Sequence, residues 1–271
     1  MMQQYMEVKE QCRDKILFFR LGDFYEMFFD DALTASRELD LTLTGRAGGN
    51  KEKVPMCGVP FHSADTYIER LVHKGYKVAI CEQMEDPKLA KGLVKRKIIK
   101  VITPGTITLE NAVASKQNNY IGCPTEKEGI ISVALMDVTT GECLWADCAA
   151  SAMEDTLFDI LAVYEPSELI YAQMGSDMDK VKQYLKSHLA QCTLTEFTPD
   201  ADTDYREKAA GYFPPQDFAA AEAAADCIGM LLTYVGEVMQ SDISHINSIE
   251  HIDNEKRLVV DAASLRHLEI T

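Results

Sequence analysis

A short apolar run, followed at once by a glycine turn and an aromatic segment, constrains the fold of this chain more than any other feature. Residues 15–20 (KILFFR) have the composition of a buried strand. Gly22 permits a turn, and Asp23 can cap a helix that we expect to start after it. Phe24 and Glu26 lie two residues apart, so their side chains point the same way if the backbone is extended there.

The pair Phe24 and Glu26 combines a flat apolar ring with a hydrogen-bonding carboxylate. Such a pair can stack on a flat heterocycle and also test the donors on its edge. The alternative places Phe24 in the core, because phenylalanine is commonly buried, and makes Glu26 a solvated acid at the start of a helix. Composition alone favours this alternative.

The first half of the chain predicts a mixed α/β domain. Hydrophobic spacing predicts a helix at 30–38 and a second helix through His73, with Ser63 as its N-cap and Gly75 after its end. The other elements that we expect are a strand at 39–44, a Gly-rich loop at 46–53, strands at 77–81 and 95–101, and a turn at Pro104–Gly105.

A short polar stretch at 109–119 indicates a domain boundary. We expect a first domain at 1–115, a second at 116–254 and the start of a further, helical region at 255–271. The second domain opens with a hairpin and then alternates strands with helices, which predicts a largely parallel sheet. Its expected elements are strands at 120–122, 130–137, 142–147, 169–172 and 192–197, helices near 153–163, 177–189 and 219–239, and two short helices around 206–213.

Charge separates the two halves of the chain. Residues 1–118 carry a net charge of +2, and residues 119–271 carry −18. The basic residues are concentrated at 91–100 (KGLVKRKIIK), which holds five positive side chains and no acid. A near-neutral half with a basic stripe can hold a phosphate backbone, whereas a strongly acidic half is repelled by it. The alternative is that this stripe is a solvated edge strand protected by lysines.

The remaining composition limits the class of protein. Hydrophobic content of 46% and charged content of 26% are typical of a soluble globular protein. We see no apolar run as long as a membrane span and no apolar core of a signal peptide. The 8 cysteines form no C-x-x-C pair and lie mostly in apolar runs, so we expect reduced core cysteines in a cytoplasmic protein. The 6 histidines show no metal-ligand spacing, so we expect no metal site.

Several longer motifs follow one another in a fixed order. They are LGDFYEMFFDDALTASRELDLTL at 21–43, VPMCGVPF at 54–61, YKVAICEQ at 76–83, VITPGT at 101–106 and LVVDAASLRHLEIT at 258–271. Together they resemble the bacterial MutS family of DNA mismatch-repair proteins along the whole chain. The resemblance implies a mixed α/β mismatch-reading domain followed by a ribonuclease-H-like α/β connector domain.

The resemblance also implies roles for individual residues. Phe24 corresponds to the wedge that stacks on a mispaired or unpaired base from the minor groove, and Glu26 to the acid that hydrogen-bonds that base. Arg46 and Arg96 correspond to family arginines near the DNA backbone, and Met56 lies in a loop that lines the minor groove. The alternatives are that both arginines are simply solvated and that Met56 is a buried loop anchor.

The sequence contains no G-x-x-x-x-G-K-[ST] phosphate loop. We therefore expect part of a longer protein, with no catalytic residues and no cofactor of its own. The resemblance implies that the full-length protein is a DNA-dependent ATPase that uses ATP and Mg and forms a homodimer. It also implies that the connector domain relays to the ATPase and helps to engage MutL.

Two other functions stay open at this point. Asp137 ends a predicted strand where a ribonuclease-H-like nuclease places its first metal-binding acid, and Glu168 and Asp226 are further carboxylates. Nothing in the sequence indicates that the three converge, and a fold alone does not carry an activity. The second alternative is an interaction scaffold, since the acidic second domain offers a surface for partner proteins.

Overall fold

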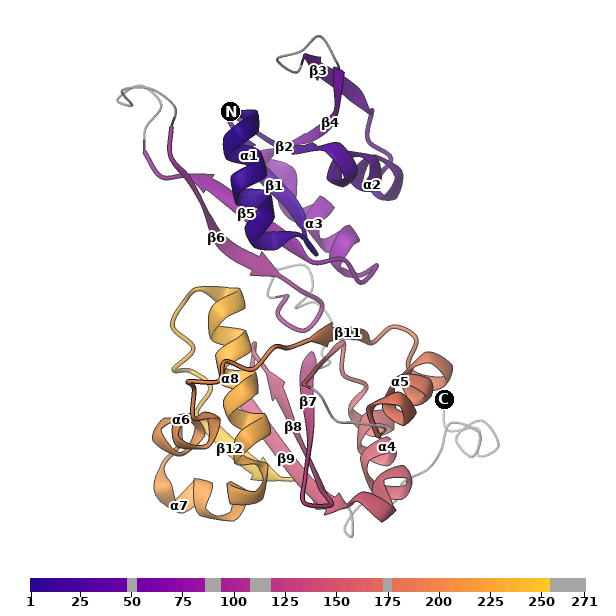
Figure 1. Cartoon of the computed structure of the whole chain (residues 1–271), viewed down its shortest axis with the longest axis vertical. Coiled ribbons are helices and arrows are strands. Elements are labelled where there is room, and N and C mark those ends of the chain that lie inside the picture. Colours follow the sequence, from indigo (N-terminus) through magenta and orange to yellow (C-terminus); the bar gives the residue numbers. More distant parts are fainter. Residues whose placement is uncertain (48–52, 86–93, 108–117, 173–176, 254–271) are drawn as a thin grey trace. The chain divides into compact units, whose positions relative to one another are not determined.

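The computed structural model describes residues 1–47, 53–85, 94–107, 118–172 and 177–253. The chain divides into two compact units, with residues 1–117 and 235–242 in the first and 118–234 and 243–271 in the second. Each unit contains its own six-stranded sheet (Figure 1). Both sheets combine parallel and antiparallel strand pairs, so the predicted mixed α/β class is confirmed. The predicted boundary at 115/116 lies outside the described residues.

The sheet of the first unit has the strand order β3-β4-β2-β1-β5-β6. β1 pairs parallel with β5, and the other neighbours are antiparallel. The elements of this unit are α1 (Met2–Lys9), η1 (Glu10–Cys12), β1 (Ile16–Leu21), β2 (Phe24–Phe28), α2 (Phe29–Leu39), β3 (Thr44–Ala47), β4 (Lys53–Pro60), η2 (Phe61–Ser63), α3 (Ala64–Val72), β5 (Val78–Gln83) and β6 (Arg96–Ile102).

The helix that we expected after Asp23 is absent, because Phe24–Phe28 form strand β2. Gly22, with φ of +58°, closes a tight turn between Leu21 and Phe24, which face each other across the hairpin. Alternate residues of β2 enter the core, with Tyr25 8% and Met27 0% exposed. Burial of this alternating set outweighs the capping potential of the aspartate.

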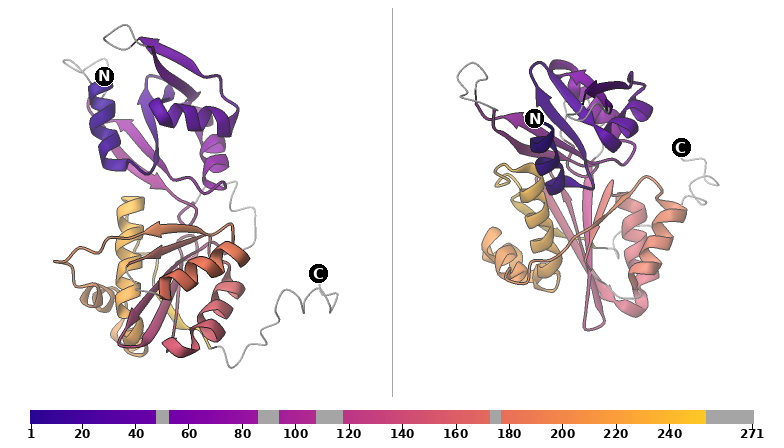
Figure 2. Two further views of the ribbon diagram at one scale, coloured as in Figure 1. Left: turned by 45° about the vertical axis from the view of Figure 1, so that its right-hand side comes forward. Right: turned by 45° about the horizontal axis from the view of Figure 1, so that its top comes forward.

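Helices cover both faces of the first sheet (Figure 2). On one face, α2 and α3 pack against a core that includes Phe18, Tyr25, Met27, Cys57 and Val59. On the other face, the ring of Tyr5 on α1 meets the rings of Phe19 and Phe28 at 5.4 and 5.0 Å between centroids. Burial raises the pKa of the Cys57 thiol to about 11, which keeps it protonated in this core.

Buried Asp31 fixes α1 to the sheet. Its carboxylate accepts hydrogen bonds from Tyr5 Oη at 3.1 Å and from the Leu17 backbone N–H at 3.0 Å. Lys9 Nζ lies 2.8 Å from the same carboxylate. A buried charge with several partners of this kind is expensive to disrupt and holds one arrangement of the elements around it.

Further local predictions in the first unit differ from the structure, among them the loop expected at 46–53, since β3 extends to Ala47 and β4 begins at Lys53. The strand expected at 39–44 is wrong, because α2 runs to Leu39, Asp40 ends it with φ of +57°, and β3 begins only at Thr44. Ser63 is the residue before α3, as expected, but its side chain caps no helix N–H. Its hydroxyl donates to the Pro60 carbonyl at 3.2 Å.

The sheet of the second unit has the strand order β11-β10-β7-β8-β9-β12. β7, β8 and β9 form an antiparallel meander, and β10, β11 and β12 add parallel to it. The elements are β7 (Tyr120–Lys127), β8 (Ile130–Asp137), β9 (Glu142–Ala149), η4 (Ala150–Ala152), α4 (Met153–Tyr164), β10 (Glu168–Tyr171), α5 (Asp177–His188), β11 (Thr193–Glu196), α6 (Tyr205–Tyr212), α7 (Pro215–Phe218), η5 (Ala219–Ala224), α8 (Ala225–Met239) and β12 (Ser248–His251).

Helices lie on both sides of this sheet as well, with α4 and α5 on one side and α8 on the other (Figure 1). This is the ribonuclease-H-like arrangement that we expected, led by the predicted hairpin. The helix predicted at 219–239 is α8 only from Ala225, since 219–224 form a 3₁₀ helix. Strand β12 was not predicted.

One helical run, Pro215–Met239, is long and apolar enough to cross a membrane by length and composition, contrary to our expectation from the sequence. In its most apolar window, 61% is buried inside the protein. Its buried side chains include Cys227, Ile228, Leu231 and Leu232, each at most 1% exposed. The part of this run up to Tyr234 therefore belongs to the core of the second unit.

Candidate functional site

The ring of Phe24 stands exposed at the start of β2. It is 45% exposed and lies in register with Leu21 of β1 and Pro60 of β4. The alternative that places Phe24 in the core is therefore wrong. The Phe24 ring is therefore accessible to another molecule.

Glu26 lies on the same face of the sheet as Phe24, because Tyr25 between them points into the core. No helix starts here, so Glu26 is not a helix-start acid. Its cross-strand neighbour is Gly58. A Cβ added at Gly58 would lie 3.1 Å from the Tyr25 carbonyl oxygen and 3.4 Å from Glu26 Cγ, so glycine lets β4 approach closely at this point.

Arg46 reaches Glu26 from strand β3. Its Nη1 lies 2.7 Å from Glu26 Oε2, and the side chains are 43% and 17% exposed, respectively. The sequence suggested a DNA contact or a solvated side chain for Arg46, and the structure shows that Arg46 pairs with Glu26. Arg46 and Glu26 thus form an ion pair without net charge, next to the exposed ring of Phe24.

Met56 lies on the same face of β4 as Gly58 and is half-buried. It stands between Phe28 of β2 and Thr44 of β3, and Thr44 Oγ1 donates to its carbonyl oxygen at 3.1 Å. Met56 therefore belongs to the same sheet face as Phe24 and Glu26, and it is neither fully buried nor free in solvent.

Arg96 does not join this group. It lies on β6, at the other edge of the sheet, and its Nε donates to the Arg20 carbonyl at 2.8 Å. Its Nη1 donates to Gln4 Oε1 at 2.8 Å and to the Val94 carbonyl at 2.9 Å, and its guanidinium lies 5.0 Å from the centroid of the Phe19 ring. Burial lowers the pKa of this guanidinium. Arg96 thus ties β6 to β1 and α1.

Sequence reasoning missed a group of side chains around the β1–β2 turn. Arg20 Nε donates to the Gly22 carbonyl at 2.6 Å, and its guanidinium lies 3.7 Å from the centroid of the Phe61 ring. Arg20 also meets Glu82, which accepts a hydrogen bond from the Tyr25 hydroxyl. Burial, with a smaller contribution from Glu82, raises the pKa of Tyr25. The one sequence feature that could have indicated this role of Arg20 is its position as a charged residue at the end of an otherwise apolar strand.

Comparison with known families covers nearly the whole chain. The family model for MutS domain I matches residues 1–111, and the model for MutS domain II matches residues 119–247. The chain belongs to the MutS family. The unit that carries Phe24 and Glu26 is its domain I, and the ribonuclease-H-like unit is its domain II, the connector.

Curated relatives carry the name DNA mismatch repair protein MutS. The chain is 44% identical to the protein of Ruminiclostridium cellulolyticum, 43% to that of Acetivibrio thermocellus and 40% to that of Alkaliphilus oremlandii. In each case the whole of this chain is covered, together with 31%, 32% and 32% of the relative, respectively. The chain therefore spans about a third of the length of these MutS proteins.

The acids of MutS domain II that could suggest a nuclease have other partners. Asp137 is fully buried at the end of β8. It accepts hydrogen bonds from the Thr139 N–H at 2.8 Å, the Thr139 hydroxyl at 2.6 Å, the Thr140 N–H at 3.3 Å and the Asn119 N–H at 3.1 Å. The carboxylate thus anchors the hairpin turn that follows its strand.

The other two acids are also engaged. Glu168 accepts hydrogen bonds from Thr195 and Tyr234, and Asp226 forms ion pairs with Lys127 and Arg206, both at 3.3 Å. Within the part of the chain that the structure describes, no group of three His, Cys, Asp or Glu could hold a metal ion. Each of the three acids therefore has a structural role in this MutS chain.

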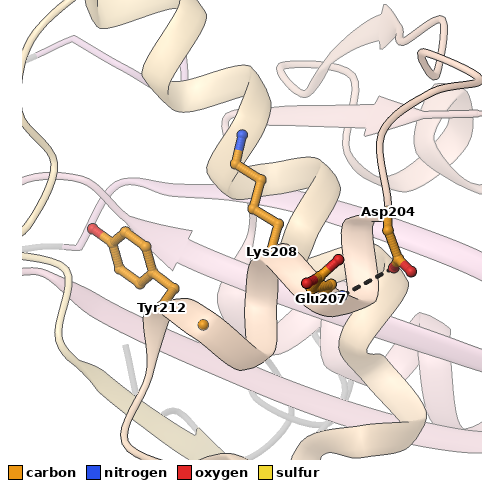
Figure 3. Close-up of a pocket in the computed structure, with 5 residues that line it drawn as sticks. Asp204, Glu207, Lys208 and Tyr212 are labelled. Carbon is orange, nitrogen blue, oxygen red and sulfur yellow. Dashed lines mark hydrogen bonds between the residues drawn. The ribbon is translucent and has the colours of Figure 1, made fainter.

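MutS domain II also has a surface pocket of about 400 Å³ beside α6 (Figure 3). It is lined by Asp204, Glu207, Lys208, Gly211 and Tyr212. Asp204 caps α6 by accepting from the Glu207 N–H at 2.9 Å, and Lys208 Nζ donates to Thr233 Oγ1 at 2.8 Å. Asp204 and Lys208 thus serve contacts within the protein, and we assign no chemistry to this pocket.

Proposed function

We propose that this chain recognises mispaired or unpaired bases in double-stranded DNA, with domain I as the reader. The observation that carries the proposal is the half-exposed Phe24 ring beside Glu26 on one face of an ordered sheet. Relatives named DNA mismatch repair protein support it. Phe24 inserts from the minor groove and stacks on the base, Glu26 accepts a hydrogen bond from that base, and Met56 lines the groove beside them.

The physical basis is the weaker stacking of a base without a proper partner. Duplex at such a point bends and unstacks at lower cost than matched duplex. A wedge inserted from the minor groove can therefore find the defect by energy and needs no sequence code. Stacking one aromatic side chain on a base contributes about 1–3 kcal/mol.

The function can be tested with a chimera in which this chain replaces the matching region of the Ruminiclostridium cellulolyticum protein. We expect this chimera to bind a duplex with a G·T mispair or one unpaired thymine more tightly than the matched duplex at the same salt concentration. Equal affinity for all three duplexes would exclude mismatch recognition.

Glu26→Gln should separate discrimination from affinity. A carboxylate among phosphates is repelled, so removal of its charge should leave matched-duplex binding equal or stronger. The ratio of mismatch to matched affinity should fall, because the acceptor of the base hydrogen bond is weakened. Affinities measured in the chimera on both duplexes check this, and equal weakening on both would make Glu26 a structural residue.

We propose that Arg96 contacts a DNA phosphate in addition to its internal hydrogen bonds. Arg96→Ala should weaken mismatched and matched duplex by similar factors and lower the slope of log affinity against log salt by about one. Lys97→Ala, at the exposed neighbour on β6, is the matched control for charge on this edge. A lower melting temperature with an unchanged salt slope would show that Arg96 serves the fold alone.

We also propose roles that depend on a longer MutS protein. Domain II connects the state of domain I to that of an ATPase that uses ATP and Mg, and it helps to engage MutL. The longer protein is a cytoplasmic homodimer. The charge of −18 on residues 119–271 supports a protein-facing rather than DNA-facing surface. The chain alone should neither hydrolyse ATP nor cleave DNA with Mg, and either activity in the purified chain would contradict this assignment.

A further inference from the structure

Among the described residues, the ion pair between Arg46 and Glu26 leaves the carboxylate with one occupied and one open oxygen. Arg46 Nη1 lies 2.7 Å from Oε2. Within the described ranges, no hydrogen bond to Oε1 is present. The open oxygen belongs to a strand position whose neighbour on the same face is the exposed Phe24.

Two further contacts restrict the carboxylate. Glu26 is only 17% exposed although it shares a sheet face with the exposed Phe24. Gly58 stands opposite, with its backbone so close that a Cβ there would lie 3.4 Å from Glu26 Cγ. The stem of Glu26 is thus held against β4, and Arg46 fixes its end. Such an arrangement selects one orientation of the carboxylate before any DNA binds.

The charge of the pair matters as much as its orientation. A single carboxylate close to the phosphates of a duplex is repelled, and the repulsion grows as water is displaced. Paired with a guanidinium at 2.7 Å, the same carboxylate forms a neutral unit. The neutral unit can approach the groove and still present Oε1 to an N–H on the edge of a base.

We infer that Arg46 is a positioning residue for base discrimination: it orients and neutralises Glu26, so that Oε1 accepts a hydrogen bond from the base on which Phe24 stacks. This inference rests on the proposed function. It differs from the role that the sequence suggested, in which Arg46 contacts the DNA backbone directly. It also differs from a latch, in which Arg46 holds Glu26 away from DNA.

A double-mutant cycle on the chimera separates these roles. The variants are Arg46→Gln, Glu26→Gln and the double substitution, and the measured quantity is the ratio of mismatch to matched affinity. Arg70→Gln is the matched control, since Arg70 is also 43% exposed and also paired with an acid, Asp40, but lies on α3. It removes the same charge from domain I without touching the β2 face.

The inference predicts that Arg46→Gln lowers this ratio by about fivefold, the effect of one partly exposed charged contact. The ratio should fall no further when Arg46→Gln is added to Glu26→Gln. Arg46→Lys, which keeps the charge, should restore part of the ratio. Arg70→Gln should leave it unchanged.

Three results would overturn the inference. Equal weakening of both duplexes, with a lower salt slope, would make Arg46 a phosphate contact. A higher ratio of mismatch to matched affinity in Arg46→Gln would show that Arg46 holds Glu26 away from DNA. If Arg46→Gln lowered the ratio as much in the Glu26→Gln protein as in the unsubstituted protein, Arg46 would act on the base without Glu26. Failure of the proposed function looks different, because the unsubstituted chimera would then show no preference for the mismatch at all.

Discussion

Phe24→Ala should remove most of the preference for a mispaired base while leaving the fold intact. The loss of one stacked ring should cost about 1–3 kcal/mol of binding free energy on the mismatched duplex. The ratio of mismatch to matched affinity should therefore fall roughly fivefold to 150-fold. Affinity for matched duplex should change little, because no wedge is inserted there. Equilibrium binding by the chimera to both duplexes at fixed salt measures the effect.

The control for this substitution is Leu33→Ala. Leu33 is 46% exposed, close to the 45% of Phe24, but it lies on α2 and not on β2. Both substitutions remove an exposed apolar side chain from the same domain, so both should leave the circular dichroism spectrum unchanged. A Phe24→Ala protein that keeps its full preference, with folding shown in this way, would contradict the assignment of the wedge.

Gly229→Ala should strongly destabilise domain II. A Cβ at Gly229 would lie 2.0 Å from the carbonyl oxygen of Tyr205, so α8 and the start of α6 would have to separate. Overpacking of this kind costs about 1–3 kcal/mol and occasionally more, and here the obstacle is backbone, which cannot rotate away. The midpoint of urea unfolding should fall accordingly.

Gly211→Ala provides the matched control for this stability prediction. Nothing lies within 4 Å of the Cβ that it adds to α6, so it should be neutral or stabilising by up to about 1 kcal/mol. The single tryptophan, Trp145, is buried on β9, and its fluorescence reports the unfolding of this domain. Equal midpoints for the two alanine variants would mean that α8 and α6 do not meet as described.

The sequence predicted most strands and helices because their burial follows a simple period. The run at 15–20 became β1, and the hairpin of β8 and β9 formed where expected. The helix predicted after Asp23 was wrong because an aspartate can either cap a helix or stand in a turn. Only the burial of Tyr25 and Met27 against helices distant in the sequence decides between the two. Local propensity does not contain that information.

Two elements of domain II also differ from the prediction. Strand β12 consists of Ser248–His251, too short and polar to stand out, and it forms because β9 offers an edge for parallel pairing. The alanine-rich run at 219–224 has high helix propensity but is 3₁₀.

Part of the candidate site could be predicted and part could not. The alternation of β2 explains why Phe24 and Glu26 share a face, as the sequence allowed. Arg46 lies 20 positions from Glu26, on a strand that was expected to be a loop, so their ion pair had no local signal. The internal bonds of Arg96 likewise depend on Gln4, 92 positions away.

The central claim, that Phe24 inserts beside a mispaired base, can be measured with 2-aminopurine placed next to that base. At saturating concentration, the chimera should raise the fluorescence of the mismatched duplex, because insertion unstacks the probe, and should leave the matched duplex unchanged. Phe24→Ala should abolish the rise at saturation, and Leu33→Ala should retain it. An equal rise with Phe24→Ala would show that another group opens the base stack.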